Sequence, residues 1–270
     1  MNPKLQKIQW FFRNSRLLGT IEKLRYLISV VKCFRKNRKF IRANPGFMVP
    51  PKSLAYDAYS APDWNFYKKS GEETALFLAG LARKYLPGVK SPRLFEWGCG
   101  PGRVIRHIAS AFSVNDNIYG SDYNHATIKW CKENIPHVYF NLNKLQPPLP
   151  FDKDFFDFIY SISVITHLSE SISHLWIAEL FRTTRPGGII IITTNGDSRK
   201  NIMLPDELEA YQRDGFVIRG KIEEGKKMFW ACHSPQYLRE KLFAAFEVLE
   251  YVSVGFPCTG QDCWVLRKPV

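Results

Sequence analysis

Apolar residues in the first forty positions recur at helical spacing. Leu17, Ile21, Leu24, Ile28 and Val31 follow one another at steps of three or four residues, and lysines and arginines lie between them. Such spacing collects apolar side chains on one face of a helix. We therefore predict an amphipathic helix over residues 5–40. It ends before the prolines at 45, 50 and 51, because proline does not continue a helix.

Between residues 93 and 195 the pattern alternates between two kinds of segment. Short runs rich in β-branched and aromatic residues predict strands at 93–97, 117–122, 137–141, 156–162 and 189–195. Longer amphipathic segments predict helices at 71–85, 104–112, 125–134 and 170–184. This alternation predicts an α/β fold with a doubly wound, mostly parallel sheet that helices cover on both faces.

The pattern changes after residue 195. Residues 196–233 predict a short helix and two strand-like pieces, and a last helix is expected over residues 235–245. Two further strands, 246–254 and 262–268, are joined by a short connection. Because a short connection suits antiparallel neighbours, we expect these two strands to form a hairpin at the edge of the sheet.

The net charge of +13 is concentrated near the N-terminus. Residues 1–45 hold twelve lysines and arginines and a single acid, Glu22, which gives this segment +11 and leaves +2 for the other 225 residues. The chain therefore divides into a basic helical arm, residues 1–50, and a nearly neutral body, residues 51–270. A hydrophobic content of 45% gives the body enough apolar side chains for a substantial core.

Cysteine spacing and hydropathy exclude several classes of protein. The six cysteines form no Cys-x-x-Cys pair, so we expect no metal site and no disulfide framework. No run of about 18 uncharged apolar residues predicts a membrane-spanning helix, and the N-terminus does not have the pattern of a signal peptide. These features predict a cytoplasmic protein with reduced thiols.

Glycines at 98, 100 and 102 lie between a predicted strand and a predicted helix. Without side chains there, the backbone can turn sharply and approach a ligand closely. Dinucleotide-binding folds have a similar loop with the spacing Gly-x-Gly-x-x-Gly, whereas here Arg103 stands where the third glycine would be. A nucleotide-like ligand is therefore expected, and an oxidoreductase that binds a dinucleotide is disfavoured.

Polar residues stand at the ends of three successive predicted strands. Glu96, Asp122 and Asn141 occupy these positions. Helix capping is an alternative role for Asp122 and Asn141. Because the carboxyl ends of parallel strands meet at one crevice, however, we expect the three side chains to share a ligand site. A carboxylate can accept hydrogen bonds from two ribose hydroxyls, and an amide can pair with the edge of adenine.

With these features the sequence resembles the class I S-adenosylmethionine-dependent methyltransferases. The resemblance covers residues 71–195 well and the C-terminal strands more loosely. It rests on FEWGCGPGR at 95–103, GSDYN at 120–124, FNL at 140–142, DFIYSISVITHL at 157–168 and RPGGIIIITT at 185–194. It implies a seven-stranded sheet whose last strand is antiparallel, and S-adenosylmethionine as the cofactor.

The resemblance also implies which residues bind the cofactor. Gly98, Gly100 and Gly102 would pass under its methionine part, with Glu96 nearby. Asp122 would hold the ribose, Tyr123 would flank the adenine, and Asn141 or Leu142 would meet the edge of the adenine. Ile162 and Ser163 would line the cofactor and the entrance to the acceptor site.

A narrower resemblance concerns the acceptor. The segments VITHLSE, HSPQYL and GQDCWVLRK look like those of bacterial methyltransferases associated with glycan and secondary-metabolite pathways. This implies methylation of an oxygen on a sugar, glycan or glycolipid, with residues 196–233 as a cap over the acceptor site. A small-molecule metabolite methylated on oxygen or nitrogen, or a non-catalytic scaffold with the same fold, is the alternative.

Removing a proton from a hydroxyl acceptor calls for a base, and histidine suits that role near neutral pH. His167 follows the fourth predicted strand, and His233 closes the 196–233 segment. We predict that one or both serve as the base. The alternative is that both are structural, with His167 packed beside the cofactor and His233 preceding a helix cap at Ser234.

The basic arm has three possible roles. A helix with apolar and Lys/Arg-rich faces is typical of a protein docked at an anionic membrane surface, here the inner face of the membrane. Nucleic acid is a second possible partner, although no nucleic-acid-binding module is recognisable. Packing of the apolar stripe on the body is the third. The sequence does not indicate an oligomeric state.

Overall fold

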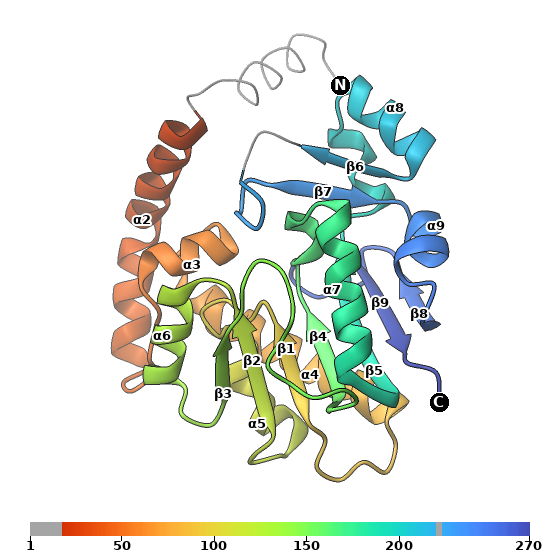
Figure 1. Ribbon diagram of the computed structural model, residues 1–270. Helices are drawn as coiled ribbons and strands as arrows, with labels where there is room; N and C mark the ends of the chain where they lie inside the picture. The colour runs from red at the N-terminus through yellow and green to blue at the C-terminus, as the bar shows by residue number, and fades with distance from the viewer. Residues whose placement is uncertain (1–17, 220–222) are drawn as a thin grey trace.

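The computed structural model describes residues 18–219 and 223–270 (Figure 1). Within them the main sheet has seven strands in the order β3-β2-β1-β4-β5-β9-β8. These strands are β1 (Leu94–Trp97), β2 (Ile118–Asp122), β3 (Tyr139–Leu142), β4 (Phe156–Ser161), β5 (Thr184–Thr194), β8 (Glu247–Val252) and β9 (Asp262–Arg267).

The first five strands in chain order run parallel to one another, and β9 is antiparallel to both β5 and β8. Strand β8 therefore lies at the edge, as the hairpin prediction requires. The four isoleucines at 189–192 of β5 are all buried, as expected for a strand covered on both faces. The predicted doubly wound, seven-stranded sheet with an antiparallel last strand is confirmed.

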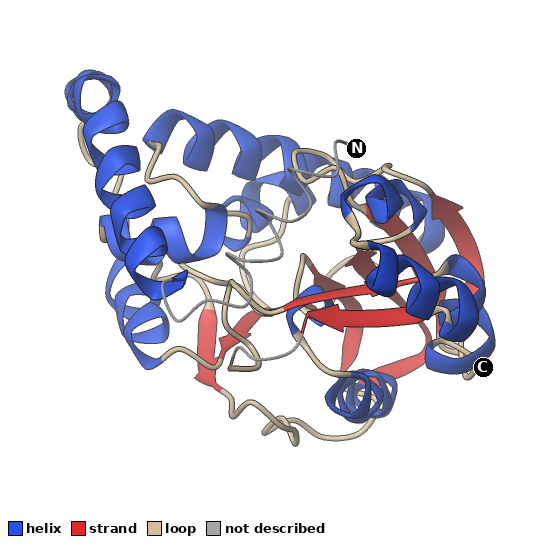
Figure 2. Ribbon diagram, turned by 90° about the horizontal axis from the view of Figure 1, so that it is seen from above, coloured by secondary structure: helices blue, strands red, loops and turns tan. Residues whose placement is uncertain are grey.

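Helices cover both faces of this sheet (Figure 2). The helices concerned are α4 (Trp64–Tyr85), α5 (Ile108–Phe112), α6 (His125–Asn134), α7 (Glu170–Thr183) and α9 (Pro235–Tyr237). One core cluster joins Leu78 of α4, Ile108 of α5 and Ile128 of α6 to the sheet. A second cluster joins Trp176 of α7 and Tyr237 of α9 to the opposite face.

Two helix boundaries differ from the predictions. Helix α4 begins seven residues earlier than expected, because the Asp63 side chain accepts hydrogen bonds from the backbone N–H groups of Asn65 and Phe66. The expected helix at 235–245 is replaced by the short α9 and a π-helical turn, η4 (Leu238–Leu242). The 3-10 turns η1 (Ile105–His107) and η2 (Ile165–His167) follow β1 and β4.

Residues 196–219 and 223–233 form a separate small unit beside the sheet. It contains η3 (Asp197–Ile202), α8 (Pro205–Asp214) and a two-stranded antiparallel sheet of β6 (Phe216–Arg219) and β7 (Trp230–His233). The predicted short helix and two strand-like pieces are therefore present. Figure 1 shows this unit above the end of the main sheet near α7 and α9.

The basic segment forms α2 (Leu18–Ala43), which α3 (Lys52–Tyr59) follows. Residues 5–17 of the predicted helix lie outside the described part. Helix α2 meets the body through Cys33, Asn37 and Phe40, all buried. The Asn37 side chain accepts a hydrogen bond from Trp64 N at 3.0 Å and donates one to Pro62 O at 2.5 Å. These contacts turn a different face of the helix to the body than the predicted apolar stripe.

Packing of that stripe on the body is therefore wrong for three of its four described members, since only Ile21 is partly buried. Leu24, Ile28 and Val31 are 58%, 45% and 75% exposed. Within residues 18–219 and 223–270 no helix is long and apolar enough to cross a membrane, and no cluster of His, Cys, Asp or Glu suits a metal ion.

Candidate active site

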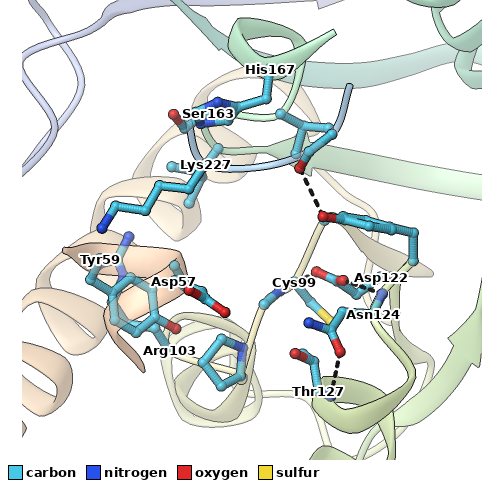
Figure 3. A pocket seen from close by; sticks show the side chains of 18 of the residues that line it. Asp57, Tyr59, Cys99, Arg103, Asp122, Asn124, Thr127, Ser163, His167 and Lys227 are labelled. Atoms are coloured by element: carbon cyan, nitrogen blue, oxygen red, sulfur yellow. Dashed lines mark hydrogen bonds between the residues drawn. The ribbon is translucent and has the colours of Figure 1, made fainter. Parts of the chain in front are cut away.

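A cavity of about 550 Å³ opens at the carboxyl ends of β1, β2 and β4 (Figure 3). Two walls face one another across it. The strand-end wall contains Gly98 to Pro101 of the glycine loop together with Asp122, Asn143 and Ser163. The predicted Gly102 does not line the cavity; a Cβ atom there would lie 2.3 Å from the Ile135 side chain, so this glycine serves packing. The outer wall contains Glu22 of α2, Asp57 and Tyr59 of α3, and residues 225–228. Segments from opposite ends of the chain therefore line one cavity.

The glycine loop lies where its backbone is exposed to the cavity. Gly98, Gly100 and Gly102 all have positive φ angles, of 75°, 50° and 73°. A Cβ atom on Gly98 would lie 2.2 Å from a methyl of Val164, whereas one on Gly100 would have no neighbour nearer than 3.6 Å. Gly98 therefore permits close packing of the loop against the segment after β4, and Gly100 keeps the cavity side open.

Asp122, at the end of β2, is held by the backbone of both neighbouring loops. Its Oδ2 accepts from Gly100 N at 3.0 Å and its Oδ1 from Asn124 N at 2.8 Å. Burial raises the pKa of this carboxyl, although the backbone N–H donors oppose that shift. The aspartate is thus oriented toward the cavity and fixed to the glycine loop, with acceptor capacity left for hydroxyl groups.

Glu96 lies at the base of the cavity and is almost fully buried. Burial raises its pKa to about 8, although the Tyr160 hydroxyl, which donates to Glu96 Oε2 at 2.9 Å, opposes that shift. Glu96 is therefore mostly protonated at neutral pH. A positively charged ligand group nearby would favour its ionised form.

The residue expected to meet an adenine edge is displaced by two positions. Asn141 and Leu142 belong to β3 and neither lines the cavity; Leu142 is 49% exposed. Asn143, one residue beyond the strand, does line it. Its Nδ2 donates to Lys144 O, while its buried Oδ1 has no hydrogen-bond partner among the described residues. The polar group presented to the cavity at the end of β3 is therefore Asn143, and the predicted Asn141 and Leu142 lie outside the lining.

The three remaining predicted residues all line the cavity. They are Tyr123, Ile162 and Ser163. Ser163 has a positive φ of 62°, and its backbone N–H donates to Thr193 Oγ1 at 2.7 Å. The Tyr123 hydroxyl donates to Gly225 O at 2.9 Å, which links the end of β2 to residues 225–228.

His167 lies at the edge of the cavity, in η2 after β4 (Figure 3). Its Nδ1 is 2.7 Å from the carbonyl oxygen of Phe229, which can only accept a hydrogen bond. The neutral ring therefore carries its proton on Nδ1, and Nε2 keeps a free lone pair. Burial lowers the pKa of His167, and the charge of Lys227 lowers it further, so the ring is neutral at physiological pH.

An ion pair holds the outer wall together. Lys227 Nζ lies 2.9 Å from Glu22 Oε1 and 3.6 Å from the centre of the Tyr56 ring. The Tyr56 hydroxyl donates to the same Glu22 oxygen at 3.0 Å. Figure 3 shows Lys227, Asp57 and Tyr59 on the side of the cavity opposite Asp122, Asn124 and Thr127. The only acid of residues 1–45 thus anchors residues 225–228 to α2.

Comparisons with known proteins agree with this geometry. Residues 95–192 match a family model described as "Methyltransferase domain". The chain is 34% identical over 101 residues to a tRNA (carboxymethyluridine(34)-5-O)-methyltransferase of Arabidopsis thaliana, across 37% of this chain and 23% of that protein. It is 31% identical over 101 residues to a probable S-adenosylmethionine-dependent methyltransferase of Mycolicibacterium smegmatis, across 37% of each.

The fold is also shared with solved structures. A S-adenosylmethionine-dependent methyltransferase from Methanosarcina mazei superposes with a TM-score of 0.55 at 17% identity, across 70% of this chain and 97% of that one. The chain contains a class I methyltransferase domain. Its cofactor is S-adenosylmethionine, and two further structures of the same fold were solved with this cofactor or its product S-adenosylhomocysteine. The chain spans about a quarter to a third of the length of the curated relatives it matches.

The cavity of the methyltransferase domain has unpaired polar groups that suit this cofactor. Asn143 Oδ1 would accept from the adenine amino group, and Asp122 would accept from the ribose hydroxyls. At the other end, the Tyr59 hydroxyl is buried without a hydrogen-bond partner among the described residues. The buried guanidinium of Arg103 lies over the Tyr59 ring, 5.5 Å from its centre. These two donors would hold the methionine carboxylate.

The structure does not bring His233 to the cavity. It is fully buried in β7 and packs against the rings of Phe216 and Tyr237, with centroid distances of 4.7 Å and 5.9 Å. Neither ring nitrogen has a hydrogen-bond partner among the described residues, and burial lowers its pKa to about 3. Because it lies outside the cavity lining, His233 cannot take a proton from an acceptor bound there.

Sequence reasoning missed Glu22, Asp57 and Lys227 as individual residues of the outer wall. Among the aromatic residues at 56–67, Tyr59 and Phe66 line the cavity, whereas Tyr56, Trp64 and Tyr67 are buried. Within the expected cap at 196–233, the cavity-lining residues are Gly225 to Met228. Lys227 lies in the segment that follows the alternating strands and helices, and this position was the only indication of its role. Nothing near Lys227 in the sequence indicated that Glu22 is its partner.

Proposed function

We propose that the whole chain is an active methyltransferase that methylates a hydroxyl group of a sugar, glycan or glycolipid, with His167 as the general base. The observation that carries this proposal is the hydrogen bond between His167 Nδ1 and Phe229 O. It leaves Nε2 unprotonated at the cavity, which is the form that a hydroxyl acceptor requires.

The cofactor supplies an electrophilic methyl group when it is bound. The chain's residues provide the rest of the chemistry. The strand-end wall holds the donor, and the outer wall places the acceptor oxygen between the donor and His167, because the displacement needs an in-line approach. His167 Nε2 then accepts the hydroxyl proton. Burial of His167 keeps the ring neutral before this step.

The outer wall has the chemistry that suits a sugar. Glu22, Asp57 and Lys227 offer carboxylate acceptors and an ammonium donor, and hydroxyl groups bind to both. The rings of Tyr59 and Phe66 add apolar surface on which a sugar's C–H face can pack. An acceptor rich in hydroxyls would satisfy these polar groups better than a purely apolar metabolite would.

The test has two parts. Calorimetry with S-adenosylhomocysteine should show binding by the wild-type chain and binding weakened at least about tenfold in Asp122→Ala, because the ribose hydroxyls lose their acceptor. Transfer of labelled methyl from S-adenosylmethionine is then measured into glycan, lipid-linked saccharide, RNA and protein fractions of the producing cells.

We expect label in a saccharide-bearing fraction, and loss of that label in His167→Ala with binding of S-adenosylhomocysteine retained. Absence of cofactor binding would refute the enzyme. Label confined to the RNA or protein fraction would refute the sugar acceptor. Full transfer by His167→Ala would refute the assignment of the base.

A further inference from the structure

Helix α2 has two faces of different character. Its inward face packs on the body through Cys33, Asn37 and Phe40 and supplies Glu22 to the cavity. Its outward face carries five large apolar side chains that are between 45% and 75% exposed: Leu24, Leu27, Ile28, Val31 and Phe34. Figure 1 shows α2 along one flank of the molecule, in red and orange.

The five apolar residues form a continuous strip. Their steps of three, one, three and three residues keep them on one side of the helix. A single exposed leucine is common on protein surfaces, but a contiguous apolar strip is not. Such a strip marks a surface that another molecule covers.

Cations surround this strip. The exposed lysines and arginines of α2 are Lys23, Arg25, Lys32, Arg35, Lys36, Arg38, Lys39 and Arg42. Two of them form ion pairs, Arg25 with Glu22 and Lys36 with Asp63. The other six have no carboxylate partner within residues 18–219 and 223–270. The covering molecule must therefore accept both apolar side chains and unpaired positive charge.

We propose that the outward face of α2 docks on an anionic phospholipid bilayer. The cations would meet the lipid phosphates, and the apolar strip would enter the interface beneath the headgroups. Nucleic acid would pair with the cations but leave Leu24 to Phe34 in water. A second copy of the helix would cover the apolar strip but bring like charges together.

This orientation has a consequence for the acceptor that rests on the proposed function. The same helix that faces the lipid supplies Glu22 to the outer wall. The acceptor end of the cavity then lies beside the membrane surface. A sugar carried on a lipid is therefore the favoured form of the acceptor.

The experiment uses the full chain in flotation with two kinds of vesicle, phosphatidylcholine alone and phosphatidylcholine mixed with phosphatidylglycerol. We expect binding to the anionic vesicles only, weakened at high salt because salt screens the charges. The double variant Arg35→Glu/Arg38→Glu should weaken binding at least about tenfold, since each cation contributes about fivefold. The double variant Leu27→Ser/Val31→Ser should also weaken binding at least about tenfold, because binding strength scales with the apolar area buried in the interface.

Matched controls change equally exposed residues elsewhere. Leu76→Ser/Leu175→Ser replaces leucines of α4 and α7 that are 59% and 48% exposed. Lys129→Glu/Lys132→Glu reverses two exposed charges on α6. Both controls should float like the wild-type chain. Calorimetry with S-adenosylhomocysteine verifies that every variant is folded.

Several outcomes would overturn the proposal. The full chain would fail to float with anionic vesicles, or the control variants would lose flotation as much as the test variants do. Alternatively, the chain would bind RNA and not vesicles, and Arg35→Glu/Arg38→Glu would abolish the RNA binding. Dimerisation in light scattering that Leu27→Ser/Val31→Ser abolishes would assign the strip to a second copy. Failure of the proposed function is distinct, because it appears in S-adenosylhomocysteine binding and in methyl transfer into the saccharide-bearing fractions, neither of which depends on flotation.

Discussion

The two walls of the cavity are built in different ways. The strand-end wall lies on a parallel sheet, and its polar groups are fixed by backbone hydrogen bonds, as Gly100 N and Asn124 N fix Asp122. The outer wall is held by side chains, chiefly the ion pair of Lys227 with Glu22, 205 positions away in sequence. Substitutions in the strand-end wall should therefore lower stability and cofactor binding together. A substitution in the outer wall should impair acceptor binding and leave cofactor binding unchanged.

The largest expected effect is that of Gly98→Ala on the strand-end wall. The new methyl would collide with Val164 at 2.2 Å, on a backbone whose φ of +75° already disfavours alanine. We expect about 3 kcal/mol lower stability in denaturant unfolding and loss of S-adenosylhomocysteine binding. Gly80→Ala in α4, where nothing lies within 4 Å, is the control and should be at least as stable as wild type. Equal stability and equal S-adenosylhomocysteine binding of the two variants would contradict the prediction that the strand-end wall is rigid.

His167→Ala comes next and separates catalysis from cofactor binding. We expect kcat to fall about 10²–10⁴-fold, the usual contribution of a general base, with unchanged affinity for S-adenosylhomocysteine. The pKa of His167 is lowered from 6.5, so wild-type kcat at saturating S-adenosylmethionine should fall in acid solution with a midpoint below pH 6.5, as the ring becomes protonated. An acid limb centred above pH 6.5 would point to a different base.

Lys227→Met tests the outer wall alone. The substitution keeps the apolar stem and removes the charge that pairs with Glu22. We expect KM for the acceptor to rise about tenfold, as for loss of a charged hydrogen bond, with the affinity for S-adenosylhomocysteine within about twofold of wild type. Lys153→Met, on the exposed surface, is the control. A large change in cofactor affinity would show that the walls are not independent.

The smallest effect concerns Glu96 at the base of the strand-end wall. Its pKa of about 8 means that binding a cation there favours release of a proton, whereas binding neutral sulfur does not. The ratio of affinities for S-adenosylmethionine and S-adenosylhomocysteine should therefore rise about three- to tenfold from pH 6.5 to pH 8.5 and then level off. Glu96→Gln should make the ratio independent of pH; a ratio that still rises would exclude this role.

The same contrast explains what could be predicted from the sequence. Strand periodicity and the glycine spacing predicted the mostly parallel sheet and the strand ends at which Gly98 and Asp122 line the cavity, because local pattern determines where a parallel strand ends. The family resemblance added Ser163, which also lines the cavity. The amide expected at the cavity was misplaced by two residues, since Asn143 lines it and Asn141 does not. The strand was expected to end at 141, whereas β3 ends at Leu142 and the chain turns into the cavity at Asn143.

Predictions failed where the position of a side chain depends on distant partners. His233 was expected at the cavity because it closes the predicted cap at 196–233, but β7 pairs it with Phe216 of β6 and buries it. The apolar stripe of α2 was one candidate for packing on the body, yet Asn37 and Phe40 make those contacts instead. The local spacing of apolar residues indicates neither the burial of His233 nor the face of α2 that meets the body. Each results from the packing of segments far apart in sequence.

The separation of the two walls also has an evolutionary consequence. Residues 225–228 and α3 approach the cavity from outside the sheet, so insertions and substitutions there leave the backbone around Asp122 and Gly98 unchanged. Descendants of one ancestral domain can thus inherit the donor half intact while the acceptor half diverges. Relatives should then keep their resemblance within residues 95–192, the part that the family model matches, and differ most in the segments that meet the acceptor.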